Sequence, residues 1–197
     1  MKDQLNITQL EEALTLLGER LGLAGEPPQE LIVCGGTSLI ARGFVSRATR
    51  DVDVLARRTT GTEFVSARVM PEVFVAAATR VAADLGLPTH WLNSGPVDLF
   101  EMGMPVGFLD RLQSKAYGTH LTVWYIGRLD QIHFKLYAAA DQGPGRHLKD
   151  LLTLNPTADE LLAAAKWAMT HDVSEGFKEL LRMLLKEINH DAVAAQL

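Results

Sequence analysis

Two short segments within residues 31–55 hold residue types that could bind a phosphate and a divalent cation. The first is Gly35-Gly36-Thr37-Ser38, which follows the apolar run 31–34. Glycines let the backbone approach a phosphate closely, and the free amides and dipole of a first helical turn favour an anion. The hydroxyl of Thr37 or Ser38 would add a donor. Alone the motif is weak, because turns between a strand and a helix often need glycine for steric reasons only.

The second segment is Asp51-Val52-Asp53-Val54-Leu55, whose alternation predicts a strand. Residues two apart in a strand point to the same face, so both carboxylates would project together. Two like charges held close repel each other unless a cation lies between them. Mg²⁺ is the natural occupant, particularly where substrate phosphates complete its shell of oxygen ligands. For an Asp-X-Asp considered alone, a solvent-facing edge strand is the better interpretation.

The two segments together indicate a more specific chemistry. A glycine turn after one strand and an aspartate pair on the next would place a phosphate cradle beside a metal site. Nucleotidyl transfer needs this combination, because amides and metal hold the triphosphate and the metal neutralises charge at the α-phosphorus.

The stretch GGTSLIARGF…RATRDVDVL resembles the signature of minimal nucleotidyltransferases related to the abortive-infection toxin AbiEii. The resemblance implies a polymerase-β-type fold, binding of an NTP, and transfer of its nucleotide to RNA, protein or a small acceptor. It implies that Gly35, Gly36 and Thr37 or Ser38 cradle the phosphates. It also implies that Asp51 and Asp53 bind the metal, and that an antitoxin is a partner of the chain if it acts as a toxin.

The resemblance extends to DQIHFKLYAAADQGPGRHLKDLLTL. By this match Lys135 would contact the triphosphate and Asp150 would be a later acidic residue, with Arg146 and Lys149 beside it. The residues themselves leave alternatives open. Arg146 and Asp150 are four apart on a helix and could simply pair. Lys135 has apolar neighbours and could extend its amine from an amphipathic helix to water.

One departure from the polymerase-β pattern concerns the third carboxylate that such enzymes usually carry on a later strand. The predicted strand 121–126 offers none, which leaves Asp98, Glu101 or Asp150 as substitutes. Without one, general-base assistance would be weaker. The rival hypothesis is therefore a nucleotide-sensing or partner-binding module that keeps the cradle without turnover.

The elements around these motifs predict an α/β (α+β) chain: a small mixed sheet with flanking helices, followed by a helical segment. Residues 1–128 would form the nucleotidyltransferase-like core, and residues 129–197 a C-terminal helical segment packed on it. Apolar periodicity predicts helices over 7–23 and 71–86, and strands over 31–34, 51–55 and 121–126. Later helices are expected over 130–141, 146–154, 157–170 and 174–189. Segments 89–92 and 97–102 are ambiguous, and one of them could be a strand.

Composition and residue spacing further limit the kinds of protein that this chain could be. The net charge of −5 argues against general polyanion binding, although a cluster of arginines around the Asp pair could accept a triphosphate or a tRNA end. The single cysteine, Cys34, is expected to be a small buried side chain. The histidines show no zinc-binding spacing. No apolar stretch approaches the roughly 20 residues of a membrane helix, so we expect a cytoplasmic protein without a membrane partner.

Overall fold

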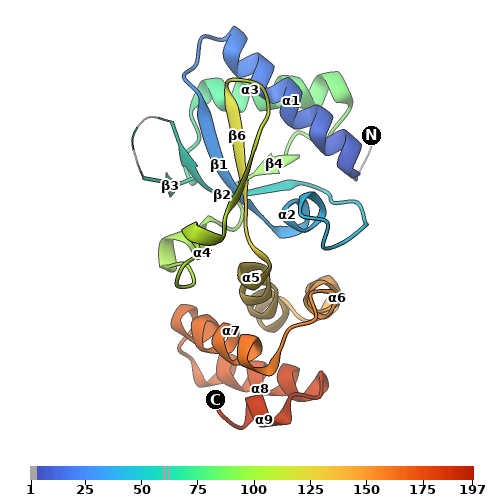
Figure 1. The fold of residues 1–197 in the computed structure, drawn as a ribbon, viewed down its shortest axis with the longest axis vertical. Helices are drawn as coiled ribbons and strands as arrows, with labels where there is room; N and C mark the ends of the chain where they lie inside the picture. The colour runs from blue at the N-terminus through green and yellow to red at the C-terminus, as the bar shows by residue number, and fades with distance from the viewer. Residues whose placement is uncertain (1–3, 60, 62) are drawn as a thin grey trace. The chain divides into compact units, whose positions relative to one another are not determined.

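The structure is a computed structural model that describes residues 4–59, 61 and 63–197. Its chain contacts divide it into two units (Figure 1). The sheet unit comprises Met1–Met104 and Leu109–Ile126, and the helical unit comprises Pro105–Phe108 and Gly127–Leu197.

The sheet unit is built on a mixed sheet with the strand order β3-β2-β1-β6-β5. Its strands are β1 (Gln29–Cys34), β2 (Val52–Arg58), β3 (Val65–Ser66), β4 (Leu92–Asn93), β5 (Gln113–Ala116) and β6 (Leu121–Tyr125). β1 is central, antiparallel to β2 and parallel to β6. The outer edge of β2 is shared, because β3 pairs with its second half and β4 with its first two residues. The predicted mixed α/β class is confirmed.

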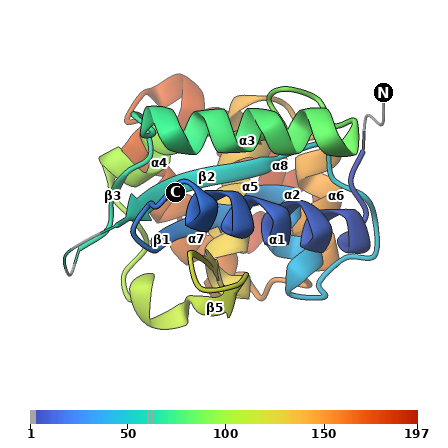
Figure 2. The ribbon, with the colours of Figure 1, turned by 90° about the horizontal axis from the view of Figure 1, so that it is seen from above.

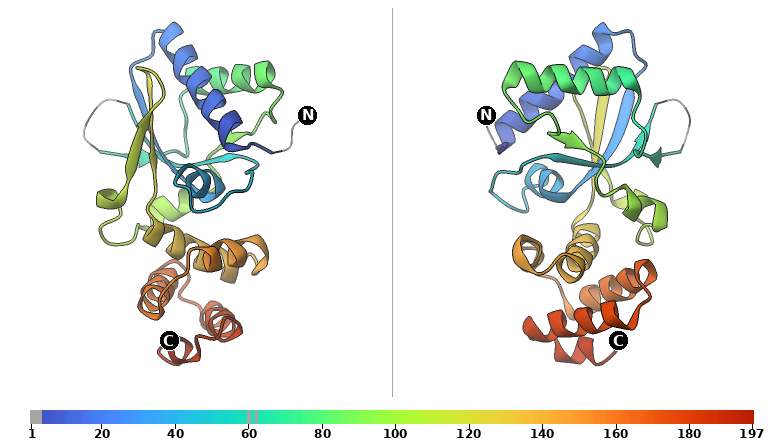
Figure 3. Two further views of the ribbon diagram at one scale, coloured as in Figure 1. Left: turned by 45° about the vertical axis from the view of Figure 1, so that its right-hand side comes forward. Right: turned by 180° about the vertical axis from the view of Figure 1, so that it is seen from behind.

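Two helices of the sheet unit, α1 (Ile7–Leu23) and α3 (Glu72–Leu85), cover one face of the sheet. They lie side by side over it (Figures 2 and 3). Their buried apolar side chains join those of the strands in one core, which includes Leu14, Phe74 and Trp91. The other helices of this unit are α2 (Gly35–Ala41) and α4 (Val97–Met102).

The alternation along β2 decides which of its side chains enter the core. Val52 and Val54 are fully buried in the core under α1 and α3. Asp53 lies between them in sequence and therefore projects from the opposite face of the sheet. A register shift between Ile32 and Val33 changes the pairing with β2 beyond that point.

The helical unit contains α5 (Arg128–Asp141), α6 (Gly145–Thr153), α7 (Ala158–His171), α8 (Glu175–Glu187) and α9 (Asp191–Ala194). α5 packs against α6, α7 and α8 (olive to red in Figure 1). The helices expected over 157–170 and 174–189 begin as predicted, with side-chain caps: Thr157 and Glu160 form a capping box, and the hydroxyl of Ser174 accepts a hydrogen bond from the amide of Phe177. Each satisfies amides that the first helical turn leaves free.

Several predicted boundaries shift. Asp51 lies one residue before β2, and α2 begins at Gly35, directly after β1. The ambiguous segment 97–102 is helix, and strand pairing is confined to Leu92–Asn93. β5 was not predicted, because all its residues are exposed and it lacks alternation. Among the described residues, no helix combines the length and apolar character needed to cross a membrane.

Candidate functional site

The glycine turn between β1 and α2 packs directly against Asp53. Gly35 has a φ of +65°, in the left-handed region that favours glycine. A Cβ at Gly35 would collide with the carboxylate oxygen Oδ2 of Asp53. Glycine is therefore required here twice, for its backbone angle and for the space that the carboxylate occupies. The turn and the aspartate, predicted separately from sequence, are in contact.

Strand pairing explains this contact. Cys34, the last residue of β1, is the cross-strand partner of Asp53. Cys34 is 3% exposed, so its predicted burial is confirmed. Asp51 precedes β2, so the pleat of the strand fixes the direction of Asp53 only. Both aspartates are partly buried.

Hydroxyl groups tie the glycine turn to the aspartate segment. Thr37 Oγ1 donates to the carbonyl oxygen of Asp51 at 2.6 Å, and Thr49 Oγ1 donates to the same oxygen at 3.3 Å. Ser38 Oγ donates to the carbonyl of Ile126 at 3.3 Å. Thr37 and Ser38 are fully buried. Since a hydroxyl has one hydrogen to donate, these bonds use the donors that the sequence predicted for phosphate, and the backbone of the turn is left for that role.

The second glycine also has a packed environment. A Cβ at Gly36 would lie 2.5 Å from Thr49 Oγ1 and 3.5 Å from a guanidinium nitrogen of Arg47. Thr49 is held in turn by paired backbone hydrogen bonds with Leu5. Contacts with Gly36 on one side and with Leu5 on the other thus hold the loop before β2 in place.

Asn93 is a site residue that sequence reasoning missed. In the parallel pairing of β4 with β2 it lies directly opposite Asp53, and paired residues of neighbouring strands point to the same face. Its side-chain oxygen accepts a hydrogen bond from the amide of Gly95 at 2.8 Å. The strand beside the aspartate therefore offers an amide, and not a carboxylate, at the position paired with Asp53. Asn93 directly follows the ambiguous segment 89–92, which was too short to be assigned as a strand from the sequence.

The two carboxylates considered as substitutes have other partners. Arg68 binds both oxygens of Glu101, at 2.6 and 2.9 Å, and also pairs with Asp98. Ser66 Oγ donates to Glu101 at 2.6 Å. The hydrogen bonds from Arg68 and Ser66 lower the pKa of Glu101 to about 2. Asp98 and Glu101 thus link α4 to the segment around β3.

The arginines near the aspartates fall into two groups. Arg57 donates to the carbonyl of Val69, and Arg58 forms a two-point ion pair with Glu30. These two stabilise the fold. Arg50 is exposed and has no hydrogen bond or ion pair in the part of the chain that the structure describes. Compared with Arg57 and Arg58, Arg50 is better placed to meet an incoming anion, because it directly precedes Asp51.

The later predicted residues belong to the helical unit. Lys135 of α5 and Asp150 of α6 form a buried ion pair, with Nζ 2.9 Å from Oδ2 and side-chain exposures of 6% and 5%. Lys135 therefore does not extend its amine into water. The alternative pairing of Arg146 with Asp150 does not occur. Arg146 and Lys149 are exposed, and their side chains make no hydrogen bond or ion pair within the described residues.

The donor set of the sheet unit fits a hard cation only in part. Asp51 and Asp53 supply carboxylate oxygens, which Mg²⁺ prefers, and substrate phosphates commonly complete such a shell. Within residues 4–59, 61 and 63–197, no three His, Cys, Asp or Glu side chains form a cluster suited to a metal ion.

The observations define a mixed α/β chain whose glycine turn, at the end of the central strand β1, abuts an aspartate near the start of β2. No protein-family model matches the chain, and no curated protein or solved structure matches it either. The function is therefore argued from the geometry of the site.

Proposed function

We propose that the chain is a Mg²⁺-dependent nucleotidyltransferase that moves a nucleoside monophosphate from an NTP to an acceptor. The observation that carries the proposal is the packing of the Asp53 carboxylate against the left-handed Gly35. A phosphate held by the glycine turn would lie next to a metal-binding carboxylate, as transfer at the α-phosphorus requires.

In this proposal the backbone of Gly35 and Gly36 receives the phosphates at the start of α2. Asp51 and Asp53 hold the cation, which neutralises charge on the triphosphate when bound. Arg50 attracts the polyanion. Thr37 positions the site by fixing the Asp51 carbonyl. An acceptor oxygen would attack the α-phosphorus, a new P–O bond would form, and pyrophosphate would leave with the electrons of the broken bond.

The acceptor follows from the family resemblance as RNA, protein or a small molecule, and an antitoxin partner would accompany a toxic activity. The chain's net charge of −5 favours a short RNA end or a protein over a long RNA. The acceptor proton would need a base, and the amide of Asn93 cannot serve as one.

Asn93 supports a second candidate function, a module that binds nucleotides without transferring them. Asn93 places an amide, and not a third carboxylate, in the strand position paired with Asp53. Such a site could bind an NTP and its cation while providing little assistance to proton removal. Both candidates predict saturable NTP binding that depends on the aspartates, and only the first predicts release of pyrophosphate.

Label transfer distinguishes them. Purified protein is incubated with Mg²⁺ and each α-labelled NTP, with total RNA and with protein alone. The transferase proposal expects label on one acceptor class, and loss of this label in Asp53→Asn and in Asp51→Ala/Asp53→Ala. Asp110→Asn is the matched control, because Asp110 is an exposed aspartate of the same unit without a hydrogen bond or ion pair in the described part of the chain. NTP binding without label or pyrophosphate would favour the module, and an active Asp53→Asn variant would refute the metal role.

A further inference from the structure

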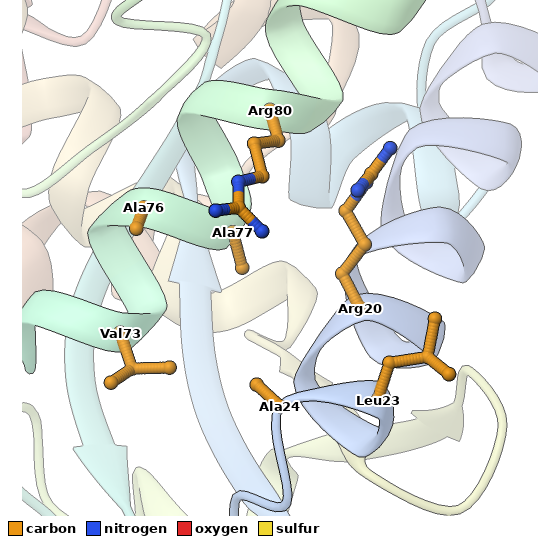
Figure 4. A pocket seen from close by; sticks show the side chains of 7 residues that line it. All are labelled: Arg20, Leu23, Ala24, Val73, Ala76, Ala77 and Arg80. Carbon is orange, nitrogen blue, oxygen red and sulfur yellow. The ribbon is translucent and has the colours of Figure 1, made fainter.

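A hollow of the sheet unit lies away from the candidate site, between the end of α1 and α3. It has a volume of about 390 Å³ and is lined by Arg20, Leu23, Ala24, Val73, Ala76, Ala77 and Arg80. Figure 4 shows the two arginines at one end and Val73 with Ala24 at the other. None of these residues belongs to the glycine turn or the aspartate segment.

The arginine end has donors that the described part of the chain does not use. Arg20 pairs through Nη2 with Asp84, while its Nε is buried and has no partner among the described residues. Arg80 is exposed and makes no hydrogen bond or ion pair there. Two guanidinium groups thus line this end, and only that of Arg20 pairs with a carboxylate among the described residues, in a chain whose net charge is −5. The surplus positive charge at this end favours an anionic ligand.

The other end of the hollow is aliphatic. Its floor includes Ala77, which is 6% exposed, and its rims are Val73 at 41% and Leu23 at 88% exposure. A pocket with mostly apolar walls and a few polar groups at one end is typical of a site that orients an amphipathic ligand.

The exposure of Leu23 distinguishes between possible ligands. A small molecule inside the hollow would leave most of this rim side chain in water. A peptide lying along the groove between the two helices would cover both rims and still place one carboxylate at the arginines. Apolar groups rimmed by charge are characteristic of surfaces that bind protein partners.

We propose that this hollow, the α1–α3 groove, binds an acidic segment of a partner protein in which Asp or Glu stands near Leu, Ile or Val. The carboxylate contacts Arg80 and Arg20, and the aliphatic side chain packs between Leu23 and Val73. This inference does not depend on nucleotidyl transfer, because it uses no residue of the candidate site.

The test is selection of peptides from a random dodecamer library displayed on phage, using the full chain as bait. The expected result is a consensus that combines an acidic and an aliphatic residue. The affinity of a synthetic consensus peptide should fall by about tenfold or more in Arg80→Glu and in Leu23→Asp, because each change opposes one part of the ligand. Thr79→Glu is the matched control: it places the same side chain as Arg80→Glu, and the same added charge as Leu23→Asp, at an exposed neighbouring position of α3 that does not line the groove, and it should bind as the wild type does.

Three results would overturn the proposal. The first is a consensus without acidic residues, and the second is an equal loss of affinity in Thr79→Glu and Arg80→Glu. The third is the absence of any consensus together with thermal stabilisation of the wild type by free octanoate, which would assign the hollow to a small aliphatic carboxylate. Label transfer measured on Arg80→Glu should equal that of the wild type, so failure here is distinguishable from failure of the transferase proposal.

Discussion

The ion pair between Lys135 and Asp150 allows a sharp test of what these two residues do. With both side chains at 6% exposure or less, removal of either charge breaks a buried ion pair from one side. Breaking a buried pair from one side costs about 3–5 kcal/mol of unfolding free energy. Replacing both members by apolar side chains of similar volume is often nearly neutral. We therefore expect Lys135→Met and Asp150→Leu each to destabilise by this amount, and the double variant to recover most of the loss.

The assay is urea unfolding of the four members of this double-mutant cycle, followed by circular dichroism. Arg146→Ala is the matched control, since Arg146 lies on the same helix as Asp150 but is exposed and does not pair with it. Its unfolding free energy should change by less than about 0.5 kcal/mol. A loss below about 1 kcal/mol in the single variants, or a double variant whose loss equals the sum of the single losses, would refute the argument from burial.

The same variants separate stability from chemistry. If Lys135 acts only through its pair, the folded double variant keeps label transfer close to that of the wild type. If the lysine contacts the triphosphate, as the family resemblance implies, the double variant is folded but inactive. Lys135→Met alone cannot make this distinction, because loss of folding would also abolish activity.

Three further predictions concern the sheet unit. Gly35→Ala should destabilise by about 1–3 kcal/mol and abolish label transfer, because its Cβ enters the space of Asp53. Gly43→Ala is the control, because Gly43 shares the positive φ, at +70°, but a Cβ there meets nothing within 4 Å. Urea unfolding should therefore show a smaller loss of stability for Gly43→Ala, and its label transfer should equal that of the wild type. Asn93→Asp should raise the rate of pyrophosphate release, measured with a coupled phosphate assay, if proton removal limits the reaction; an unchanged rate with unchanged NTP binding would contradict this placement. For Glu30, burial raises the pKa, but the hydrogen bonds from its arginine and tryptophan partners and the arginine's charge lower it overall from 4.5. Its stabilisation is therefore present at neutral pH and is lost as pH falls below about 4.5 through the lowered folded value, so Glu30→Gln should flatten acid unfolding curves in that range.

The parts of the fold and site that could be predicted are those encoded locally. The apolar run of β1, the two glycines and the alternation of β2 lie within 30 residues of one another, and each has a period or a turn signal of its own. The mixed α/β class followed from these signals. Contact between Gly35 and Asp53 required only that two neighbouring strands pair in register.

The parts that could not be predicted depend on pairing between distant segments. Asn93 reaches Asp53 only because the two-residue strand β4 joins the edge of β2 after the whole of α3, and a two-residue strand has no detectable period. The burial of Lys135 likewise depends on a partner across the turn between α5 and α6. The hydroxyls of Thr37 and Ser38 have the residue types of phosphate ligands, yet tertiary contacts decide that they donate to carbonyls.

These contacts make the charge next to Asp53 the property on which the proposed function depends. The carbonyl of Asp51 is held by two hydroxyls, so the turn and the aspartate segment form one rigid unit, as electrostatic stabilisation of a transition state requires. A rigid site would support nucleotide binding and nucleotidyl transfer equally well. An amide opposite Asp53 lowers the negative charge that would attract the cation and supplies no base, so it affects transfer more than binding. Asn93→Asp therefore changes the property in which the two candidate functions differ, the charge and basicity of the residue opposite Asp53. Faster pyrophosphate release in this variant identifies a transferase that is slowed by its amide. Tighter metal and NTP binding without pyrophosphate release identifies a binding module.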